Sequence, residues 1–391
     1  MKVRSVPQRV GGSRRATARR TLTTGLVTAT LVTFGVPAIA AGSLAQPSCF
    51  GRPATITGAG TINGTEGDDV IIGSPGDDDI DGRGGNDLIC GRSGNDAVQG
   101  GLGDDQVDGG TGDDRIRGDL YSATADVEGG GNDRLYGGPG DEFITGDSRS
   151  DGGNATGGGD DLIDGGPGID RIHGDSGTFA AGTTATGGGN DRIFGGGGDD
   201  SLVGDSRAAR PLILGGGGHA IGAGDDVLDG GPGANGMVGD SEAVLSVRGA
   251  GGNDVLRNVG EFAAGDHNIL EPTGGGATGA GNDTITGTSA REILVGDSSV
   301  VDVTETDAGH DVVRGLGGND TLFGDNVDFE ATATVGTSGG RDRLFGDRGN
   351  DTLRAGPADD LLHGGPQTDI CDGEAGGGDV ALQCETVVGV P

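Results

Sequence analysis

A nine-residue pattern repeats through most of this 391-residue chain. It is plainest from Gly64 to Arg117, which reads GTEGDDVII, GSPGDDDID, GRGGNDLIC, GRSGNDAVQ, GGLGDDQVD and GGTGDDRIR. Each copy has Gly at positions 1 and 4, Asp at position 6 and an aliphatic residue at position 8. A short fixed period is typical of solenoids, in which each repeat stacks on its neighbours. Because two repeats complete one coil, we expect the turns to stack in two columns around one shared interior.

The repeat resembles the nonapeptide of the haemolysin-type, or RTX, calcium-binding family, whose pattern is GGxGxDxUx with U an aliphatic residue. The resemblance extends from Gly64 to Asp372. It implies an all-β fold, a parallel β-roll or β-helix solenoid with calcium ions held between adjacent coils. Glycine suits such turns because it adopts backbone conformations that leave carbonyl groups free to approach an ion.

By the same resemblance, the position-6 aspartates bind Ca²⁺ together with carbonyl groups of the turns. Calcium takes about six to eight oxygen ligands, so two stacked turns must share an ion. The aspartates concerned are Asp69, Asp78, Asp87, Asp96, Asp105, Asp114, Asp133, Asp161, Asp170, Asp191, Asp200, Asp226, Asp254, Asp283, Asp311, Asp320, Asp342, Asp351, Asp360 and Asp369. On one column, position 6 is instead Glu142, Asn235 or Glu292, and residues 258–264 fall two short of a nonapeptide, so those sites are in doubt.

The composition excludes several classes of protein. Ninety-one glycines and no tryptophan leave too few large side chains for a wide globular core. The formal net charge of −35 would repel nucleic acid and anionic lipid. We therefore expect no nucleic-acid partner and no membrane insertion. A chain this acidic needs cations to fold, and carboxylates select hard ions such as Ca²⁺.

The N-terminus has the features of an export signal. Seven basic residues and no acidic residue fall within the first 40 positions, and small-residue cleavage sites end at Ala40 and Ala45. The alternative is a membrane anchor, which the Thr and Gly content of Leu22–Ala41 disfavours. We therefore predict a secreted, extracellular protein.

Four cysteines fit an oxidising compartment. In a solenoid Cys49 and Cys90 lie near one end, and Cys371 and Cys384 lie near the other, so we expect the disulfides Cys49–Cys90 and Cys371–Cys384. The chain divides into six segments: a signal peptide (1–45), an N-terminal lead or cap (46–63), a regular β-roll (64–117), a β-roll with eight expanded loops (118–339), a second regular β-roll (340–372) and a C-terminal cap (373–391).

From residue 118 to residue 339, every second turn is lengthened by ten to seventeen residues, which places eight long loops on one side. Each loop opens with Gly-Asp, and these aspartates are Asp119, Asp147, Asp175, Asp205, Asp240, Asp266, Asp297 and Asp325. We hypothesise that loop-opening and loop-closing aspartates, such as Asp147 and Asp161, form a second kind of metal site. The alternative is an Asx turn that starts the loop. The loops themselves fit either passive elongation of the coil or hairpins that form a lateral sheet or binding face.

These features favour a calcium-binding protein that folds with calcium and has a structural or adhesive role at the cell envelope or in the matrix. Cell-wall or exopolysaccharide material is the candidate partner. The alternative is a polysaccharide lyase or epimerase on a parallel β-helix that uses the long-loop face. An enzyme of that kind needs basic, His or Tyr residues at fixed coil positions, and the sequence aligns none. We expect the five histidines to be solvent-exposed and the protein not to be an enzyme.

Overall fold

The computed structural model describes residues 46–208, 218–270, 275–301, 307–374 and 377–391. In these ranges the regular elements are β-strands of two to six residues, β1 to β44. The predicted export signal lies outside the described residues. Among the described residues no helix is long and apolar enough to cross a membrane.

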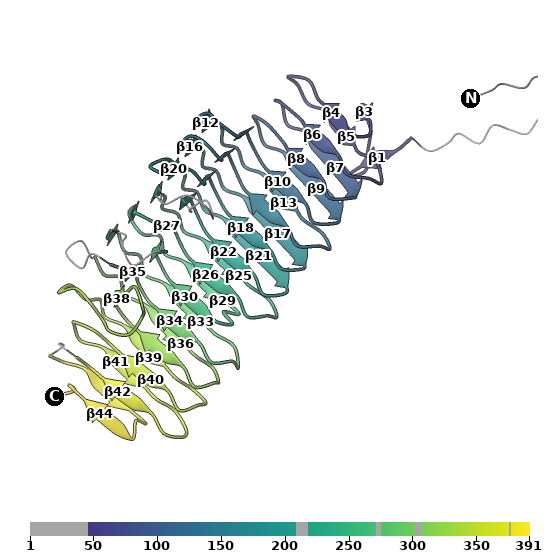
Figure 1. Cartoon of the computed structure of the whole chain (residues 1–391). Coiled ribbons are helices and arrows are strands. Elements are labelled where there is room, and N and C mark those ends of the chain that lie inside the picture. Colours follow the sequence, from purple (N-terminus) through teal and green to yellow (C-terminus); the bar gives the residue numbers. More distant parts are fainter. Residues whose placement is uncertain (1–45, 209–217, 271–274, 302–306, 375–376) are drawn as a thin grey trace, which may run out of the picture. The chain divides into compact units, whose positions relative to one another are not determined.

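Two parallel sheets of 14 strands each form the body of residues 46–391. The first long sheet contains β3 (Ile56–Thr57), β5 (Val70–Ile72), β7 (Leu88–Ser93), β9 (Gln106–Thr111), β13 (Arg134–Tyr136), β17 (Leu162–Pro167), β21 (Arg192–Gly197), β25 (Val227–Asp229), β29 (Val255–Arg257), β33 (Thr284–Thr286), β36 (Val312–Arg314), β39 (Arg343–Phe345), β41 (Leu361–His363) and β43 (Val380–Leu382). The second long sheet contains β4 (Thr61–Asn63), β6 (Asp79–Asp81), β8 (Ala97–Gln99), β10 (Arg115–Arg117), β14 (Phe143–Thr145), β18 (Arg171–His173), β22 (Ser201–Val203), β26 (Gly236–Val238), β30 (Phe262–Ala264), β34 (Ile293–Val295), β37 (Thr321–Phe323), β40 (Thr352–Arg354), β42 (Ile370–Asp372) and β44 (Thr386–Val388). Each coil contributes one strand to each sheet, and the coils stack in sequence order (Figure 1). The predicted all-β parallel solenoid is confirmed.

A ladder of aliphatic side chains fills the space between the two long sheets. Ile89 pairs in register with Ile71 on one side and with Val107 on the other, and all three are fully buried. Each such side chain contributes roughly 1.5–3 kcal/mol by its burial. In the shortened repeat, Ala263 takes the same place in register with Met237. The position-8 residues therefore form one continuous core, and each coil depends on its two neighbours.

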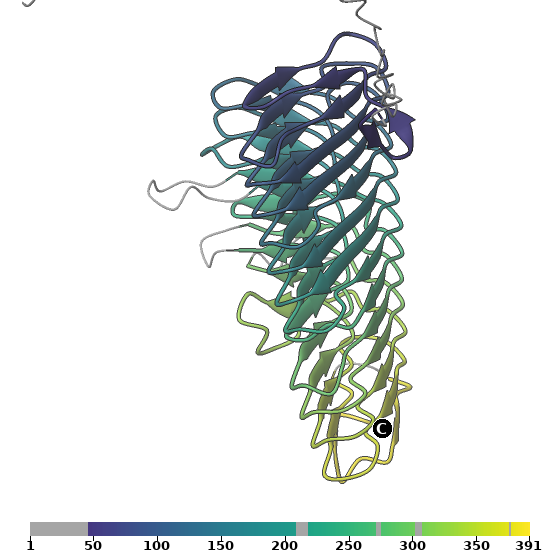
Figure 2. The same cartoon turned by 90° about the vertical axis from the view of Figure 1, so that its right-hand side faces the viewer.

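The long loops form two further parallel sheets. The eight-stranded lateral sheet contains β11 (Tyr121–Ser122), β15 (Arg149–Ser150), β19 (Gly177–Thr178), β23 (Arg207–Ala208), β27 (Glu242–Ala243), β31 (Asn268–Ile269), β35 (Ser299–Val300) and β38 (Val327–Asp328). The six-stranded lateral sheet contains β12 (Val127–Glu128), β16 (Ala155–Thr156), β20 (Thr184–Thr186), β24 (His219–Ile221), β28 (Ser246–Arg248) and β32 (Ala277–Thr278). The described lateral strands pair with the same strand of the next coil rather than with each other as hairpins (Figure 2). The eighth loop also folds back on itself, since Val327 forms an antiparallel bridge with Thr334. Small residues such as Ala185, Ala208 and Val247 form a second, narrow core within the loops.

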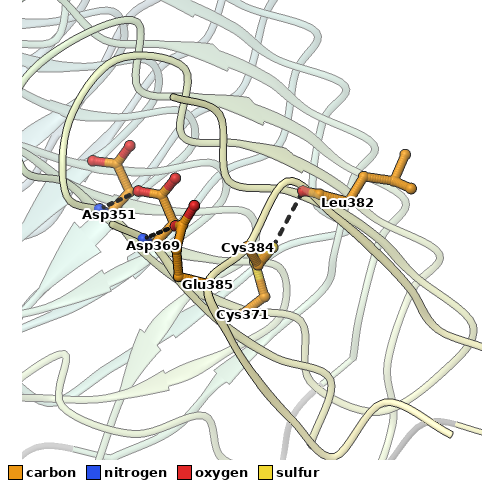
Figure 3. Close-up of a disulfide and its surroundings, with 6 residues drawn as sticks. All are labelled: Asp351, Asp369, Cys371, Leu382, Cys384 and Glu385. Carbon is orange, nitrogen blue, oxygen red and sulfur yellow. Dashed lines mark hydrogen bonds between the residues drawn. A yellow bond between two sulfur atoms is a disulfide. The ribbon is translucent and has the colours of Figure 1, made fainter. Parts of the chain in front are cut away.

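Both ends of the solenoid carry a disulfide. At the N-terminal end β1 (Ser48–Cys49) pairs antiparallel with β2 (Arg52–Pro53), and Cys49 is bonded to Cys90 of β7. At the other end Cys371 of β42 is bonded to Cys384 (Figure 3). The two predicted disulfides are therefore confirmed.

Candidate metal centres

The predicted aspartates stand in two columns, one at each turn of the coil. All of them are buried, with at most 7% of any residue exposed. The long-loop column, which precedes the strands of the first long sheet, contains Asp69, Asp87, Asp105, Asp133, Asp161, Asp191, Asp226, Asp254, Asp283, Asp311, Asp342 and Asp360. The short-turn column, which precedes the strands of the second long sheet, contains Asp78, Asp96, Asp114, Asp170, Asp200, Asp320, Asp351 and Asp369. The structure thus brings the predicted residues together in rows rather than scattering them.

One oxygen of each carboxylate joins neighbouring coils. The backbone N–H of Asp87 donates to Oδ1 of Asp105 at 2.7 Å, and the same bond recurs from coil to coil. In the long-loop column this row runs without a gap from Asp69 to Asp379. These bonds fix each carboxylate in the turn and leave its second oxygen free to bind something else.

That second oxygen is buried without a partner. Except in Asp69 and Asp78, Oδ2 of every predicted aspartate finds no hydrogen-bond donor among the described residues. A buried charged oxygen is strongly unfavourable unless it is paired, hydrogen-bonded or coordinated to a metal. These oxygens are therefore available to a cation.

The position-1 glycines let the oxygen ligands of two coils approach each other closely. A Cβ atom on Gly146 would collide with the carbonyl oxygen of Gly174 and with Oδ2 of Asp161, and the same arrangement recurs at Gly82. Each cradle is thus bounded by a carboxylate of its own repeat and a carbonyl of the next coil. Carboxylate and carbonyl oxygens are the ligands that Ca²⁺ prefers, so the residues present fit calcium.

Burial raises the pKa of these carboxyl groups. The pKa of Asp87 rises to about 6, because desolvation and the negative charge of Asp69 outweigh the backbone donor of the preceding coil. Desolvation likewise raises the pKa of Asp105 and of Asp114 to about 7. Near neutral pH the rows therefore bind either protons or metal ions.

We expect the metal-free protein to gain structure as the pH falls. The folded-state pKa values of Asp87 and Asp105 lie above the ordinary value of 3.8, so between pH 4 and 7 the folded chain holds more protons than the unfolded chain. Stability without metal then decreases as the pH rises through that window. Circular dichroism in EDTA across this pH range measures the effect, and the same series in excess calcium is the control. A metal-free β signal that grows with pH would contradict the expectation.

The three position-6 residues that are not aspartate differ in how their side chains are hydrogen-bonded. The side-chain amide of Asn235 donates to the carbonyl oxygens of Gly231 and Asn258, both at 3.1 Å, so this side chain is satisfied without an ion. Glu142 instead keeps both carboxylate oxygens buried and unpartnered, like the aspartates. The Oε1 of Glu292 accepts the backbone N–H of Thr288 at 2.7 Å.

The first turns of both columns are also satisfied internally. The N–H of Thr65 donates to Oδ2 of Asp69 at 2.8 Å, and the N–H of Ser74 donates to Oδ2 of Asp78 at 2.6 Å. In these turns a hydrogen bond occupies the oxygen that is free in the later repeats. Asp69 and Asp78 are therefore the weakest candidates in the predicted set.

Two acidic residues extend the columns beyond the predicted set. Asp379 accepts the N–H of Asp360 at 3.0 Å, and its Oδ2 is buried without a partner. Glu385 accepts the N–H of Asp369 at 2.7 Å, beside the C-terminal disulfide (Figure 3). Both lie past the last regular nonapeptide, and the sequence signal for Asp379 is the run of three glycines directly before it.

A family model described as the RTX calcium-binding nonapeptide repeat (4 copies) matches most of the chain. The matched residues are 56–89, 91–120, 129–151, 156–178, 185–206, 222–243, 277–298, 302–327 and 337–379. The chain belongs to this RTX family. No curated protein matches it. RTX nonapeptide repeats bind Ca²⁺, so the resemblance seen in the sequence and the predicted cofactor are both confirmed.

This RTX protein also has a basic and aromatic cluster that the sequence did not reveal. We call it the arginine–aromatic cluster, and it consists of Arg115, Arg117, Tyr121, Phe143, Arg149, Arg171 and Phe179. Arg149 lies over the rings of Phe143 and Phe179, at 4.2 and 4.3 Å, and Arg117 lies over Tyr121 at 4.0 Å. Arg115, Phe143 and Arg171 recur every 28 residues at the same place in the coil, as do Tyr121 and Arg149, but the change from one residue type to another along each row hid the cluster in the sequence.

The expectation of exposed histidines holds only for His310, since His219 and His363 are half-buried and the other two are buried. His173 of β18 and His267 are fully buried, and His267 lies within the loops, where its Nδ1 accepts the N–H of Ser241 and its Nε2 lies 3.1 Å from the carbonyl oxygen of Thr278. Arg207 hydrogen-bonds Nε2 of His173 at 3.2 Å and forms an ion pair with Glu242 at 2.8 Å. Burial, with the neighbouring positive charge of Arg207, lowers the pKa of His173 well below its usual value. His173 is thus a neutral packing residue.

Proposed function

We propose that this RTX protein is secreted, folds only when calcium is present, and has a structural or adhesive role at the cell envelope or in the matrix. The observation that carries the proposal is the unbroken row of buried carboxylates from Asp69 to Asp379. Such a row needs cations to be compact, and cytosolic calcium is too low to fill sites of millimolar affinity. Family membership also fits secretion, because RTX repeat proteins are typically secreted.

The arginine–aromatic cluster supports an adhesive role. Arg115 pairs with Phe143 and Phe143 with Arg171 along the second long sheet, and both arginines are exposed. Burial, and after it the positive charge of Arg149, lowers the pKa of Arg117 to about 10. Arg149 itself is ion-paired with Asp151 at 3.0 Å, so among the described residues the free positive charge of this surface lies on Arg115 and Arg171. In a chain with a net charge of −35, this surface suits an anionic partner. Arginine forks bind carboxylates and aromatic rings pack on sugars, so we propose acidic cell-wall polymer or exopolysaccharide.

Co-sedimentation with a uronic-acid polymer in excess calcium tests this role. We expect the double substitution Arg115→Ala and Arg171→Ala to reduce the bound fraction at least fivefold, because both side chains reach solvent. Arg192→Ala is the matched control, since Arg192 is exposed on the first long sheet. Equal binding by all three proteins, or equal binding to an uncharged polymer, would rule out this surface.

The cluster favours binding over the alternative of a lyase or epimerase. Such chemistry needs a proton-transfer group that reaches the substrate. His173, the histidine nearest to Phe143, is fully buried and held by Arg207. The hydroxyl of Tyr121 donates to Asp151 at 3.0 Å, and burial together with Asp151 raises the pKa of Tyr121, which makes its deprotonation to a base less favourable. We therefore infer that the cluster serves attachment.

A further inference from the structure

The loop-opening aspartates form a third row, beside the long-loop column. Asp119, Asp147, Asp175 and Asp205 are all fully buried. Ser148 follows Asp147, and its hydroxyl donates to the carbonyl of Gly129 at 3.1 Å, which fixes the start of one loop against the end of the preceding one. Ser176 and Ser206 make the same bond in the next two coils. The structure thus holds loop openings and loop closings together.

This arrangement gathers carboxylates in threes. Three groups have carboxylate oxygens within 4.8 Å of one another among the described residues: Asp119–Asp133–Asp147, Asp175–Asp191–Asp205 and Asp205–Asp226–Asp240. We call them the aspartate triads. Each triad combines two successive loop-opening aspartates with the loop-closing aspartate between them. Each triad includes the hypothesised pair of a loop's opening and closing aspartates, as Asp119–Asp133, Asp175–Asp191 and Asp205–Asp226. The example Asp147 joins the triad of the preceding loop, and its negative charge also raises the pKa of Asp161, after the larger effect of burial.

The triads contain oxygens with no partner. Both carboxylate oxygens of Asp119, and one oxygen each of Asp147, Asp175 and Asp205, find no hydrogen-bond donor among the described residues. An Asx turn would satisfy them within the same loop. That alternative applies further along the chain, where Asp266 accepts the N–H of Gly281, a residue of its own loop, at 2.8 Å. In the triads it applies only to Asp240, whose two carboxylate oxygens both accept the N–H of Gly252 of its own loop at 3.2 Å, whereas the other loop-opening members each keep at least one oxygen without a donor among the described residues.

The dimensions of a triad match one calcium ion. A Ca²⁺–oxygen bond is about 2.3–2.6 Å, so ligand oxygens around one ion lie no more than about 5 Å apart. The closing aspartates Asp133, Asp191 and Asp226 belong to the long-loop column, so each triad adds two loop-opening carboxylates to the single carboxylate that an ordinary nonapeptide cradle offers per turn. Buried like charges at this spacing repel strongly unless a cation lies between them.

We propose that the three aspartate triads are a second class of calcium site, more acidic and tighter than the nonapeptide cradles. The proposal rests on calcium being the ion of the two columns. Because Asp205 belongs to two triads, it bridges adjacent ions and couples their binding. The more acidic sites also favour a trivalent ion over Ca²⁺ more strongly than the cradles do.

Terbium(III) is the probe for this class. The calcium-loaded chain is titrated with terbium in excess calcium, and the bound terbium is counted by mass spectrometry after gel filtration. We expect three tight equivalents in the unsubstituted protein, two in Asp119→Asn and one in Asp205→Asn, since Asp205 serves two triads. Circular dichroism in calcium confirms that each variant is folded.

Asp160→Asn is the matched control. Asp160 is exposed beside Asp161, and the equivalent positions in the neighbouring coils are Asn132 and Asn190. We expect it to retain three equivalents. If the Asp205→Asn variant does not fold, the terbium count of Asp119→Asn decides the test. Asp119 opens the loop that contains β11, the end strand of its lateral sheet, so this substitution has a neighbouring lateral strand on one side only. The inference is overturned if the unsubstituted chain takes no tight terbium, if both triad variants retain three equivalents, or if Asp160→Asn loses as many. A protein that keeps its β signal in EDTA would instead contradict the proposed calcium-dependent folding.

Discussion

Chelation of calcium with EDTA should abolish most of the β signal of this protein at neutral pH. The aspartates of both columns are buried, and most of them keep an unpartnered oxygen that repels its neighbours when no cation is present. Because each coil is stabilised only by the coils beside it, loss of the ions should unfold the repeats together. We expect the signal to return cooperatively at about 0.1–1 mM calcium, the range of extracellular calcium modules. Far-ultraviolet circular dichroism during a calcium titration measures this.

Two controls separate ligation from charge screening. Magnesium at the same concentration should restore little structure, because it requires a smaller octahedral site and gives up its water reluctantly. Sodium chloride should also restore little, since salt screens buried charges poorly. A β signal that survives EDTA, or that sodium chloride restores as well as calcium does, would show that the columns do not need the ion.

Substitution of Gly146 by alanine should be among the most damaging single changes in the chain. The new Cβ would meet the backbone carbonyl of Gly174 and Oδ2 of Asp161, so it blocks a cradle and pushes two coils apart. Overpacking alone costs roughly 1–3 kcal/mol, and a backbone neighbour has little freedom to yield. We expect the calcium midpoint to rise at least tenfold, or folding to fail, as judged by circular dichroism.

Gly236→Ala is the matched control. Gly236 lies in β26 between Ser201 and Phe262, and a Cβ there would meet nothing within 4 Å. The Gly236→Ala substitution should therefore leave stability unchanged, or should stabilise the fold by roughly 0.4–1 kcal/mol because alanine lowers the conformational entropy of the unfolded chain. Equal effects of the two substitutions would show that glycine content, rather than the cradle at Gly146, limits stability.

The solenoid and its core could be predicted because the residues that form them recur at a fixed spacing of nine. The position-8 side chain of every unit has to face the same interior, as Ile71, Ile89 and Val107 do. The same period places Asp87 and Asp105 one above the other. Where the period fails, as at Asp379, the prediction stops although the column continues.

The lateral sheets could not be predicted in the same way. Their narrow core uses small residues such as Ala185, Ala208 and Ala220, which have no distinctive spacing in loops of unequal length. The arginine–aromatic cluster escaped for a different reason: Tyr121 and Arg149 do recur at a fixed spacing of 28 residues, but only the stacked loops bring the arginines over the aromatic rings. The sequence also did not show that Asp147 would join Asp119 and Asp133, because that grouping depends on which loop end each carboxylate faces.

The stacking of the eight lateral strands places the long loops at regular intervals along the axis of the solenoid. The loop that opens at Asp119 closes at Gly131, and the longer one that opens at Asp205 closes at Gly224, yet both return to the same column. The position of a loop along the axis is thus set by the count of coils and is independent of loop length. Seven intervals of about 4.8 Å place the first and eighth loops about 34 Å apart. Guest segments of different size, grafted between a loop-opening and a loop-closing residue, would therefore be displayed at that fixed spacing.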